Sequence, residues 1–504
     1  MEMFHPFILL LLFISTLFFL CKLNRAWFHK SNLPPSPPRL PIIGNFHQLG
    51  TLLHRSLGAL SKKYGPLMLL HLGNTPHLIV SSAEMAKEIL KTHDIAFANR
   101  PFTTAGKKLL YGCTDIGFAP YGEYWRQIRK IVVLDLLSIK RVQSFKLVRE
   151  DMASSMIIDI SCLSSNGDPV DLSKIIICFA KNLVLRCALG GELEKQNNFE
   201  KSSRELMKLM GAFSFADLFP WMGWIDVLSG LNGRMKKVSR KLDAFLDQVI
   251  DEHVSEMKDG DGQDFVDLLL LAQRDSSNDI KITRDSVKAI LLDMFLAGTD
   301  TPAIVIEWIM AELLKNPSIM KKTQEEVRRV VGQKAKVDED DIYQMEYLQA
   351  VFKEALRLHP PVPLLVPREC YTSIKIKNYF IPPHTRVMIN VWAIQRDPKL
   401  WERAEEFFPE RFINSGIDYK GQDYEYIPFG SGRRSCPAMS YGTVMVQFAV
   451  ANLLYWFDWE FPGNTNRFEF DMTEAFGINV SKKLPLYLVP IPGGPSIRKL
   501  PRQL

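Results

Sequence analysis

The sequence predicts a large domain built around long helices, and two segments carry this prediction. Residues 284–315 hold the longest helical pattern in the chain, with Thr283 as a candidate N-cap and Asn316-Pro317 at its end. A helix of this length spans about 48 Å, which is enough to cross a domain. Residues 438–457 form a second, largely apolar stretch. Scattered polar residues interrupt it, so we interpret it as a helix buried in the core rather than as a membrane span.

The composition favours one large folded domain in a reducing compartment. The chain has 504 residues, of which 47% are hydrophobic and 23% charged, and we find no internal repeat or low-complexity linker after residue 40. The net charge of +6 is mild and spread along the chain, so no nucleic-acid surface is expected. The seven cysteines have no regular spacing, which argues against a disulfide framework.

Residues 1–30 are predicted to form a membrane anchor with a basic flank. Residues 7–21 are almost entirely apolar and, with the apolar residues just before them, can span a bilayer once. A cleaved signal peptide is the alternative, but it would carry positive charge before the apolar run. Here Glu2 precedes the run and Lys22 and Arg25 follow it, which places everything after the anchor in the cytosol.

Residues 31–45 are predicted to form a proline-rich hinge. Each proline fixes its own φ angle and disfavours helix in the residue before it, so this segment should be extended and stiff. We interpret it as a spacer between the anchor and a catalytic domain at residues 46–504, with an ordinary proline-rich linker as the alternative.

Residues 429–438 read Phe-Gly-Ser-Gly-Arg-Arg-Ser-Cys-Pro-Ala. No second cysteine lies at zinc-like spacing from Cys436, so a structural zinc site has little support, whereas one thiolate can hold haem iron alone. Pro437 favours a helix start with Cys436 as its cap, and the helix N-terminus would lower the pKa of the thiol. The alternative is an ordinary buried cysteine before a core helix.

The middle of the long predicted helix reads Ala297-Gly-Thr-Asp-Thr-Pro302. Pro302 has no N–H for the carbonyl of Gly298, so we expect a kink with a freed carbonyl beside the Asp300 and Thr301 side chains, a place that can host water. The alternative is a simple proline kink in which the Thr301 hydroxyl bonds back to a helix carbonyl.

Together these segments resemble the cytochrome P-450 superfamily over essentially the whole chain. Its haem-binding signature sets Phe429, Gly432, Arg434 and Cys436 at fixed offsets, and the chain departs from it only where Ala438 replaces the usual glycine. The wording of several motifs resembles the microsomal A-type plant members of family 71. The resemblance implies the cytochrome P-450 fold, mainly α with a small β-sheet region, preceded by one N-terminal transmembrane helix in the endoplasmic reticulum membrane.

The resemblance also implies roles for individual residues. Cys436 would be the axial ligand of heme b (iron protoporphyrin IX), and Asp300 and Thr301 would deliver protons to bound oxygen. Glu354 and Arg357, three residues apart on one predicted helix, would close a structural network with Arg411. The candidates for binding the two haem propionates are Trp125, Arg129, Arg368 and Arg434, all of which donate hydrogen bonds.

The residues expected to face the substrate carry no charge, so the substrate should be small, apolar and neutral. They are Ala297, Val362, Leu364, Leu365, Phe476 and Ile478. Phe213, Phe215, Phe219 and Trp221 could add an aromatic wall or a membrane-facing entry, and core packing is the equal alternative for them.

The expected function is therefore a haem-thiolate mono-oxygenase that hydroxylates, epoxidises or oxidatively cyclises a plant specialised metabolite, with a terpenoid or an alkaloid favoured. Because the chain has no glycine-rich nucleotide motif, NADPH should be used by a partner, NADPH-cytochrome P-450 reductase. The alternatives are an oxygen-independent haem-thiolate isomerase or dehydratase, a phenylpropanoid or coumarin oxidase, and a non-catalytic haem-binding protein.

Overall fold

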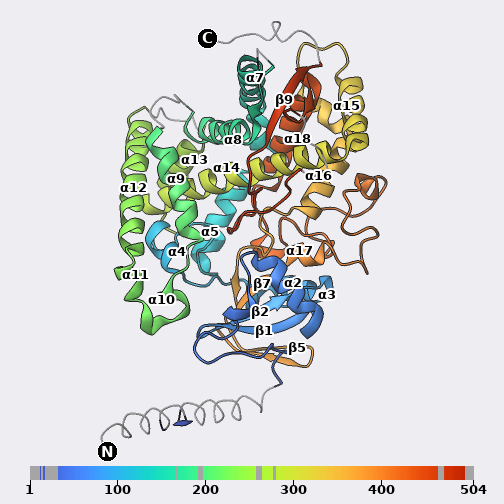
Figure 1. Ribbon diagram of the computed structural model, residues 1–504. Helices are drawn as coiled ribbons and strands as arrows, with labels where there is room; N and C mark the ends of the chain where they lie inside the picture. The colour runs from blue at the N-terminus through green and yellow to red at the C-terminus, as the bar shows by residue number, and fades with distance from the viewer. Residues whose placement is uncertain are drawn as a thin grey trace, which may run out of the picture.

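Helix α14 (Arg284–Lys315) crosses the middle of the molecule in the computed structural model (Figure 1). Its bounds are those predicted from the sequence. The Thr283 hydroxyl accepts a hydrogen bond from the N–H of Ser286 in a capping box, and Pro317 begins the next helix directly after Asn316. Most residues of α14 are buried on every side, which is the pattern of a central core helix.

The structure describes Leu12, Ser15, Thr16 and residues 32–164, 167–190, 197–256, 264–275, 280–463 and 470–493. Nearly all of the predicted anchor therefore lies outside the described residues. Among the described helices, α14 is the one that is long and apolar enough to cross a membrane, and its apolar stretch is mostly buried in the protein. We therefore assign α14 to the core of the domain.

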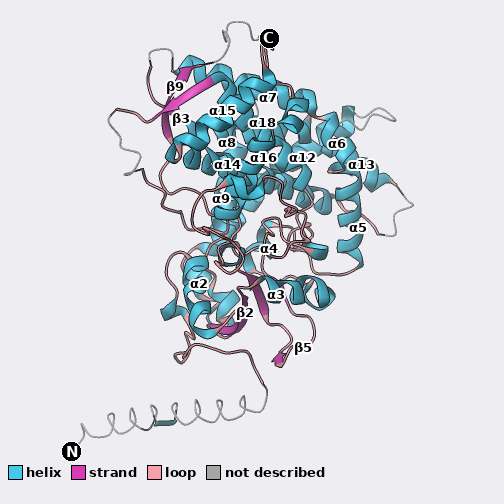
Figure 2. Ribbon diagram, turned by 90° about the vertical axis from the view of Figure 1, so that its right-hand side faces the viewer, coloured by secondary structure: helices cyan, strands magenta, loops and turns pink. Residues whose placement is uncertain are grey.

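Most of the molecule is helical, as Figure 2 shows. Helices α8 (Leu172–Leu189), α16 (Glu346–Leu358) and α18 (Met439–Trp456) pack against α14. The remaining longer helices are α2 (Leu53–Tyr64), α5 (Glu123–Ile131), α7 (Lys146–Leu163), α9 (Asn197–Met210), α12 (Leu231–Glu256), α13 (Phe265–Arg274) and α15 (Pro317–Val331). Shorter α-helices are α3 (Ala83–Lys87), α4 (Thr104–Leu109), α6 (Ile139–Ser144), α10 (Phe215–Leu218), α11 (Ile225–Leu228) and α17 (Val391–Ile394). Single helical turns of other types are η1 (Phe46–Gln48), η2 (Glu88–Thr92), η3 (Asp94–Phe97), η4 (Val132–Leu136), η6 (Pro220–Met222), η7 (Glu339–Gln344), η8 (Pro409–Phe412) and η9 (Gly432–Arg434).

The strands form small sheets at two ends of the molecule (Figures 1 and 2). The largest is mixed, in the order β1-β2-β7-β4, with β2 parallel to β7 and antiparallel to β1. A three-stranded sheet in the order β3-β9-β8 lies at the far end, and β5 and β6 pair as a hairpin. The strands are β1 (Leu67–Leu72), β2 (Thr75–Val80), β3 (Val170–Asp171), β4 (Arg368–Glu369), β5 (Ile374–Ile376), β6 (Tyr379–Ile381), β7 (Arg386–Ile389), β8 (Phe457–Glu460) and β9 (Tyr487–Pro492).

The described part of the proline-rich segment lies against the domain. Residues 32–39 form neither helix nor strand, which agrees with the predicted extended conformation. However, Pro34 and Pro37 are buried, and the carbonyl of Pro35 accepts a hydrogen bond from Leu69 N–H in β1 at 2.9 Å. This part of the segment therefore lies along the first sheet.

Candidate active site

A cavity of about 330 Å³ lies beside the middle of α14, between that helix and the loop that carries Cys436. Its apolar lining comes from α14, from the segment after α16, from the loop before α5 and from helices α8 and α9. Four arginines line it as well, so one chamber combines an apolar wall with a strongly cationic one.

The loop before α18 places Cys436 at the edge of this cavity. Gly430 and Gly432 both have a φ of +71°, and a Cβ on Gly432 would meet the carbonyl oxygen of Leu90 at 2.4 Å. Only glycine fits there, which explains the spacing of this motif. The N–H of Cys436 then donates to the carbonyl of Phe429 at 2.9 Å, which folds the loop back on itself. Both Phe429 and Cys436 line the cavity.

The start of α18 differs from the sequence prediction. Ala438 is the N-cap and the helix begins at Met439, so Cys436 precedes the helix instead of capping it. Burial raises the pKa of the Cys436 thiol, although the N–H of Ala438 and the charge of Arg129 act to lower it. The expected lowering of the pKa by the protein alone is therefore wrong, because burial outweighs both effects. A coordinating metal ion deprotonates a thiol outright and removes this penalty.

The cationic wall is formed by Arg100, Arg129, Arg368 and Arg434. Arg434 donates to the carbonyls of Ala98 at 2.8 Å and Ala119 at 2.6 Å, and Arg368 donates to Ser431 O and to Asp94. Burial and the charge of Arg368 lower the pKa of Arg434 to about 9. Such crowding of cations costs free energy unless anions balance it, so this wall fits a ligand that carries carboxylates.

The structure does not bring Trp125 to the cavity. Its indole N–H donates to the carbonyl of Ile116 at 3.0 Å, and its ring lies 4.0 Å from the guanidinium of Arg434. Trp125 therefore helps to hold the guanidinium of Arg434 in place through a cation–π contact. Arg100, which sequence reasoning missed, lines the cavity instead and is fixed by the carbonyls of Gly117 and Val366.

On α14, some of the residues around Pro302 line the cavity and others do not. Ala297, Gly298 and Thr301 line it, and the Thr301 hydroxyl donates to the carbonyl of Ala297 at 2.5 Å. This is the back-bond that the simple proline-kink alternative predicts. Asp300 does not line the cavity. Burial raises the pKa of Asp300, and the charge of Arg204 on α9 opposes this effect.

Of the predicted substrate-facing residues, Ala297, Val362, Leu365 and Ile478 line the cavity, whereas Leu364 and Phe476 do not. Leu364 packs with the small core cluster next to β1 and β2, and Phe476 is 63% exposed. Their absence from the lining corrects the predicted pocket. Phe213 and Phe219 pack against Phe46, and Phe215 packs against both of them, outside the cavity lining.

Comparison with known proteins identifies the family. The model of the cytochrome P-450 family matches residues 34–487. The chain belongs to the cytochrome P-450 family. It is 61% identical over 97% of its length to desmethylyatein synthase from Sinopodophyllum hexandrum, of which the alignment covers 99%. It is 54% identical to cytochrome P-450 71A1 from Persea americana, over 95% of this chain and 98% of that protein.

Further relatives agree with this assignment. Phenylacetaldehyde oxime monooxygenase from Prunus mume is 49% identical over 92% of this chain and 90% of its own length. A zebrafish cytochrome P-450 solved with abiraterone has the same fold, with a TM-score of 0.72 and 25% identity over 87% of this chain and 99% of that chain. The protein is thus a cytochrome P-450 mono-oxygenase that resembles family 71, and its family implies a haem with a cysteine thiolate ligand.

Two residues of this cytochrome P-450 site, Met207 and Met210 on α9, were not predicted from the sequence. They line the cavity together with Ile116 and Phe118 from the loop before α5. The three-residue spacing of the two methionines was the one available signal, because it puts them on one helix face.

Asp293 was also missed, although it lines the cavity from α14. Its Oδ2 atom accepts hydrogen bonds from the N–H groups of Ile116 and Gly117, and the nearby Asp115 accepts one from Phe118 N–H. Burial raises the pKa of Asp115 to about 6, and burial together with the charge of Asp115 raises the pKa of Asp293. Two close carboxyl groups of this kind hold a proton between them more readily than two negative charges.

The predicted Glu354 network is closed in the structure. Glu354 accepts two hydrogen bonds from Arg357, both at 2.8 Å, and lies 3.1 Å from Arg411 Nε. Both Glu354 and Arg357 are fully buried, and Arg357 also donates to the carbonyls of Gln395 and Ala404. None of the three lines the cavity. They act by holding α16 to the loops that follow it.

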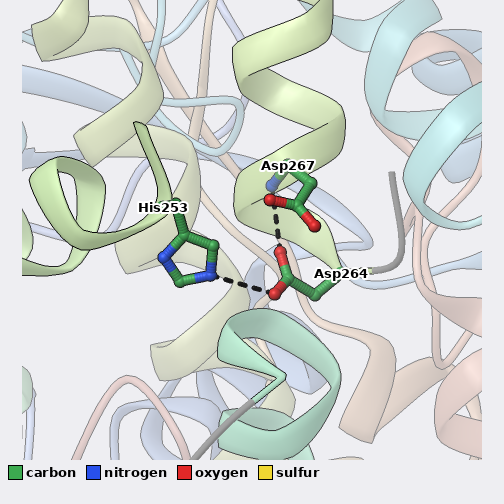
Figure 3. A group of neighbouring side chains, drawn as sticks. All are labelled: His253, Asp264 and Asp267. Atoms are coloured by element: carbon green, nitrogen blue, oxygen red, sulfur yellow. Dashed lines mark hydrogen bonds and ion pairs between the residues drawn. The ribbon is translucent and has the colours of Figure 1, made fainter. Parts of the chain in front are cut away.

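A second group with metal-ligand chemistry lies far from Cys436 in the sequence (Figure 3). His253 on α12 faces Asp264 at 3.0 Å, and Asp264 caps α13 by accepting from Asp267 N–H. The other ring nitrogen of His253 donates to the carbonyl of Val249 at 2.8 Å. Burial lowers the pKa of His253, but the hydrogen bond to Asp264 outweighs it and raises the pKa to about 9. The raised pKa favours the charged imidazole, which donates from both ring nitrogens, so a metal would have to displace one of these protons.

Proposed function

We propose that this cytochrome P-450 is a microsomal enzyme that oxidises a small, neutral, largely apolar specialised metabolite of plants, with Cys436 as the ligand of its haem iron. The main observation behind this proposal is that Cys436, an apolar wall and four arginines line one and the same cavity. A haem has an iron that needs the thiolate, an apolar ring, and two propionates that need donors.

The chain's residues divide these tasks. Arg434, Arg368, Arg129 and Arg100 would bind the propionates, and Phe429 would pack against the ring beside the sulfur. When bound, the haem supplies oxygen activation, and a cysteine thiolate favours O–O bond cleavage. The apolar wall formed by Val362, Leu365 and Ile478 on the cavity would exclude water and hold the substrate.

Thr301 is proposed to hold and pass protons at its hydroxyl. Its bond to the carbonyl of Ala297 leaves the hydroxyl oxygen free to accept a hydrogen bond from water in the cavity. Pro302 leaves the carbonyl of Gly298 without a helix donor, which adds an acceptor for the same water. Asp300 would pass protons toward Thr301 without touching the cavity itself. Its carboxyl group does not line the cavity, and burial raises its pKa.

The substrate class follows from the apolar cavity and from the relatives. Desmethylyatein synthase is the relative with 61% identity, so we propose compounds related to desmethylyatein as the first candidates. The terpenoids and alkaloids favoured in the sequence analysis follow as the next candidates.

We propose that the enzyme is held at the endoplasmic reticulum membrane by residues 1–30 and takes electrons from NADPH-cytochrome P-450 reductase. Trp221, Trp224 and Leu228, around α10 and α11, are strongly exposed. The N–H of Asn74 donates to Leu218 O and that of Gly73 to Ile43 O, so the turn between β1 and β2 joins this apolar surface to the proline-rich segment. An apolar surface of this kind suits contact with lipid beside an anchor.

One experiment tests the haem site and a second tests the substrate. The reduced microsomal protein is exposed to carbon monoxide, and we expect the red-shifted absorption band of a thiolate-ligated haem, which Cys436→Ser should abolish. A well-folded protein without this band would refute the haem assignment. Product formation is then measured with oxygen, NADPH and the reductase on a panel of aromatic and terpenoid compounds. Oxidation of terpenoids alone would refute the proposed substrate class.

A further inference from the structure

We infer that Glu474 is a positioning residue that fixes the cavity-lining turn at residues 474–482, here called the substrate turn, to helix α2. It does so through a buried carboxylate that touches neither the haem nor the substrate. This inference rests on the proposed function, because it concerns how the cavity accepts large ligands.

The substrate turn is a narrow loop whose tip reaches the cavity. At its base Glu474 and Lys482 form an isolated bridge, and the N–H of Ala475 donates to the carbonyl of Ser481 at 2.8 Å. Ile478 lines the cavity from the tip. A Cβ on Gly211, just after α9, would lie 3.8 Å from a side-chain carbon of Ile478, so the tip also borders α9. Any shift of this turn therefore changes the shape of the chamber.

Two further hydrogen bonds hold the backbone of the turn near its tip. Val480 N–H donates to the carbonyl of Pro361 at 2.8 Å, and the indole of Trp308 approaches the carbonyl of Val480 at 3.4 Å. Both contacts lie on the side of the turn nearest to α14 and α16. The side chain of Glu474 adds contacts from the base of the turn to α2.

The carboxylate of Glu474 is buried against α2. Its side chain is 4% exposed, and its Oε2 atom accepts from Arg55 Nε at 2.6 Å and lies 3.0 Å from His54 Nε2. Burial alone would raise the pKa of Glu474, but the hydrogen bonds from His54 and Arg55 lower it to about 2. The group is therefore a carboxylate, which accepts only, and His54 must donate from Nε2.

Helix α2 is in turn a rigid support. The ring of His54 packs edge-on against Trp392 at 5.3 Å, and the carbonyl of His54 accepts from the Asn390 side chain at 2.8 Å. The guanidinium of Arg55 lies 5.2 Å from the same Trp392 ring. The two partners of Glu474 are thus fixed by α17 and the residue before it, and a buried pair of this kind specifies one geometry.

Removing the charge should loosen the turn without disturbing the iron. Glu474→Gln keeps the size of the side chain but loses the ionic bonds to His54 and Arg55. We expect the haem-loaded variant to bind clotrimazole, a bulky triaryl imidazole that must contact the cavity walls, roughly tenfold more weakly than wild type. Imidazole, which reaches the iron without touching the turn, should bind both proteins within about twofold of each other.

Hydrogen–deuterium exchange gives a readout that needs no ligand. In Glu474→Gln the amides of the substrate turn, such as those of Ala475 and Val480, should exchange faster, whereas those of α18 should not change. Glu84→Gln is the matched control, because Glu84 also forms an ion pair, with Lys377, but is exposed and lies on α3. It should behave as wild type in both measurements.

If Glu474→Gln does not fold, Arg55→Gln tests the same interaction from the side of α2. Arg55 is about half exposed, so its loss should be tolerated, and it should weaken clotrimazole binding by about threefold. The double variant should bind clotrimazole no more weakly than Glu474→Gln alone, because both changes break one interaction. Unchanged clotrimazole affinity in the folded variants, with the thiolate band intact, would overturn the inference. Absence of that band in the wild-type protein would refute the proposed function instead, and the exchange measurement would still test the role of Glu474.

Discussion

The Oδ2 atom of Asp293, in the middle of α14, accepts a hydrogen bond from the N–H of Ile116 at 2.7 Å and ties the loop before α5 to the central helix. The same oxygen accepts from Gly117 N–H at 3.0 Å. Because Ile116 and Phe118 line the cavity, these hydrogen bonds help to set its shape.

The tie predicts different outcomes for two substitutions of Asp293. Asp293→Asn keeps an oxygen for both N–H groups and should retain near wild-type stability and clotrimazole affinity, because burial and the charge of Asp115 already raise the pKa of Asp293. Asp293→Leu leaves two N–H groups without an acceptor and should lower the free energy of unfolding by about 2–5 kcal/mol. Urea unfolding and clotrimazole titration measure both effects. Equal loss in both variants would show that the charge, and not the acceptor, holds the loop.

The Thr301 hydroxyl should couple electron use to product formation. Thr301→Ala removes the hydroxyl, so product formed per NADPH consumed should fall by about tenfold or more, while the thiolate band stays unchanged. Thr301→Ser keeps a hydroxyl at the same place and should retain most of the coupling. The ratio of product to NADPH, measured with reductase in excess, gives the answer. Full coupling in Thr301→Ala would remove Thr301 from proton delivery.

The sequence could predict features that depend on local patterning. The bounds of α14 follow from a capping box at its start and a proline just after its end. The path of the loop around Cys436 follows from its glycines, because only glycine fits the backbone geometry at Gly432. Both signals are local: the capping partners lie within a few residues of each other, and the glycine positions depend on the conformation of the backbone itself.

The side-chain directions depended on distant partners and could not be predicted. The indole N–H of Trp125 donates to the carbonyl of Ile116, and the loop that carries Ile116 is held in turn by Asp293, more than 170 residues away in the chain. Leu364 and Leu365 were expected in an extended segment, but they lie in a turn that is closed by the hydrogen bond from Leu365 N–H to the carbonyl of Val362 at 3.0 Å. Leu365 also has a φ of +52°, so nothing in the sequence says which of the two faces the cavity.

The pair of His253 and Asp264 should make stability depend on alkaline pH. The pKa of His253 is raised to about 9 in the folded protein, above its ordinary value of 6.5, because the hydrogen bond to Asp264 outweighs burial. Its contribution to stability is therefore complete below pH 6.5 and is lost as the pH rises through about 9. Wild type should lose more stability than His253→Gln between these pH values, as measured by urea unfolding. His384→Gln, at an exposed histidine, should follow wild type. Because both ring nitrogens of His253 are donors, EDTA should leave the curves unchanged.

Arg434 and Arg433 offer a matched test of the cationic wall. Arg434 is buried, lines the cavity and holds the carbonyls of Ala98 and Ala119, whereas the side chain of Arg433 is 45% exposed and pairs with Asp94. Lysine keeps the charge but lacks the planar fork that reaches two carbonyls and stacks on Trp125. Arg434→Lys should therefore lose most of its haem during purification, and Arg433→Lys should keep it. The haem-to-protein absorbance ratio reports this directly, and the unfolding curve shows whether the fold survives. Equal haem content in the two variants would mean that charge alone, wherever it sits on this loop, suffices to hold the propionates.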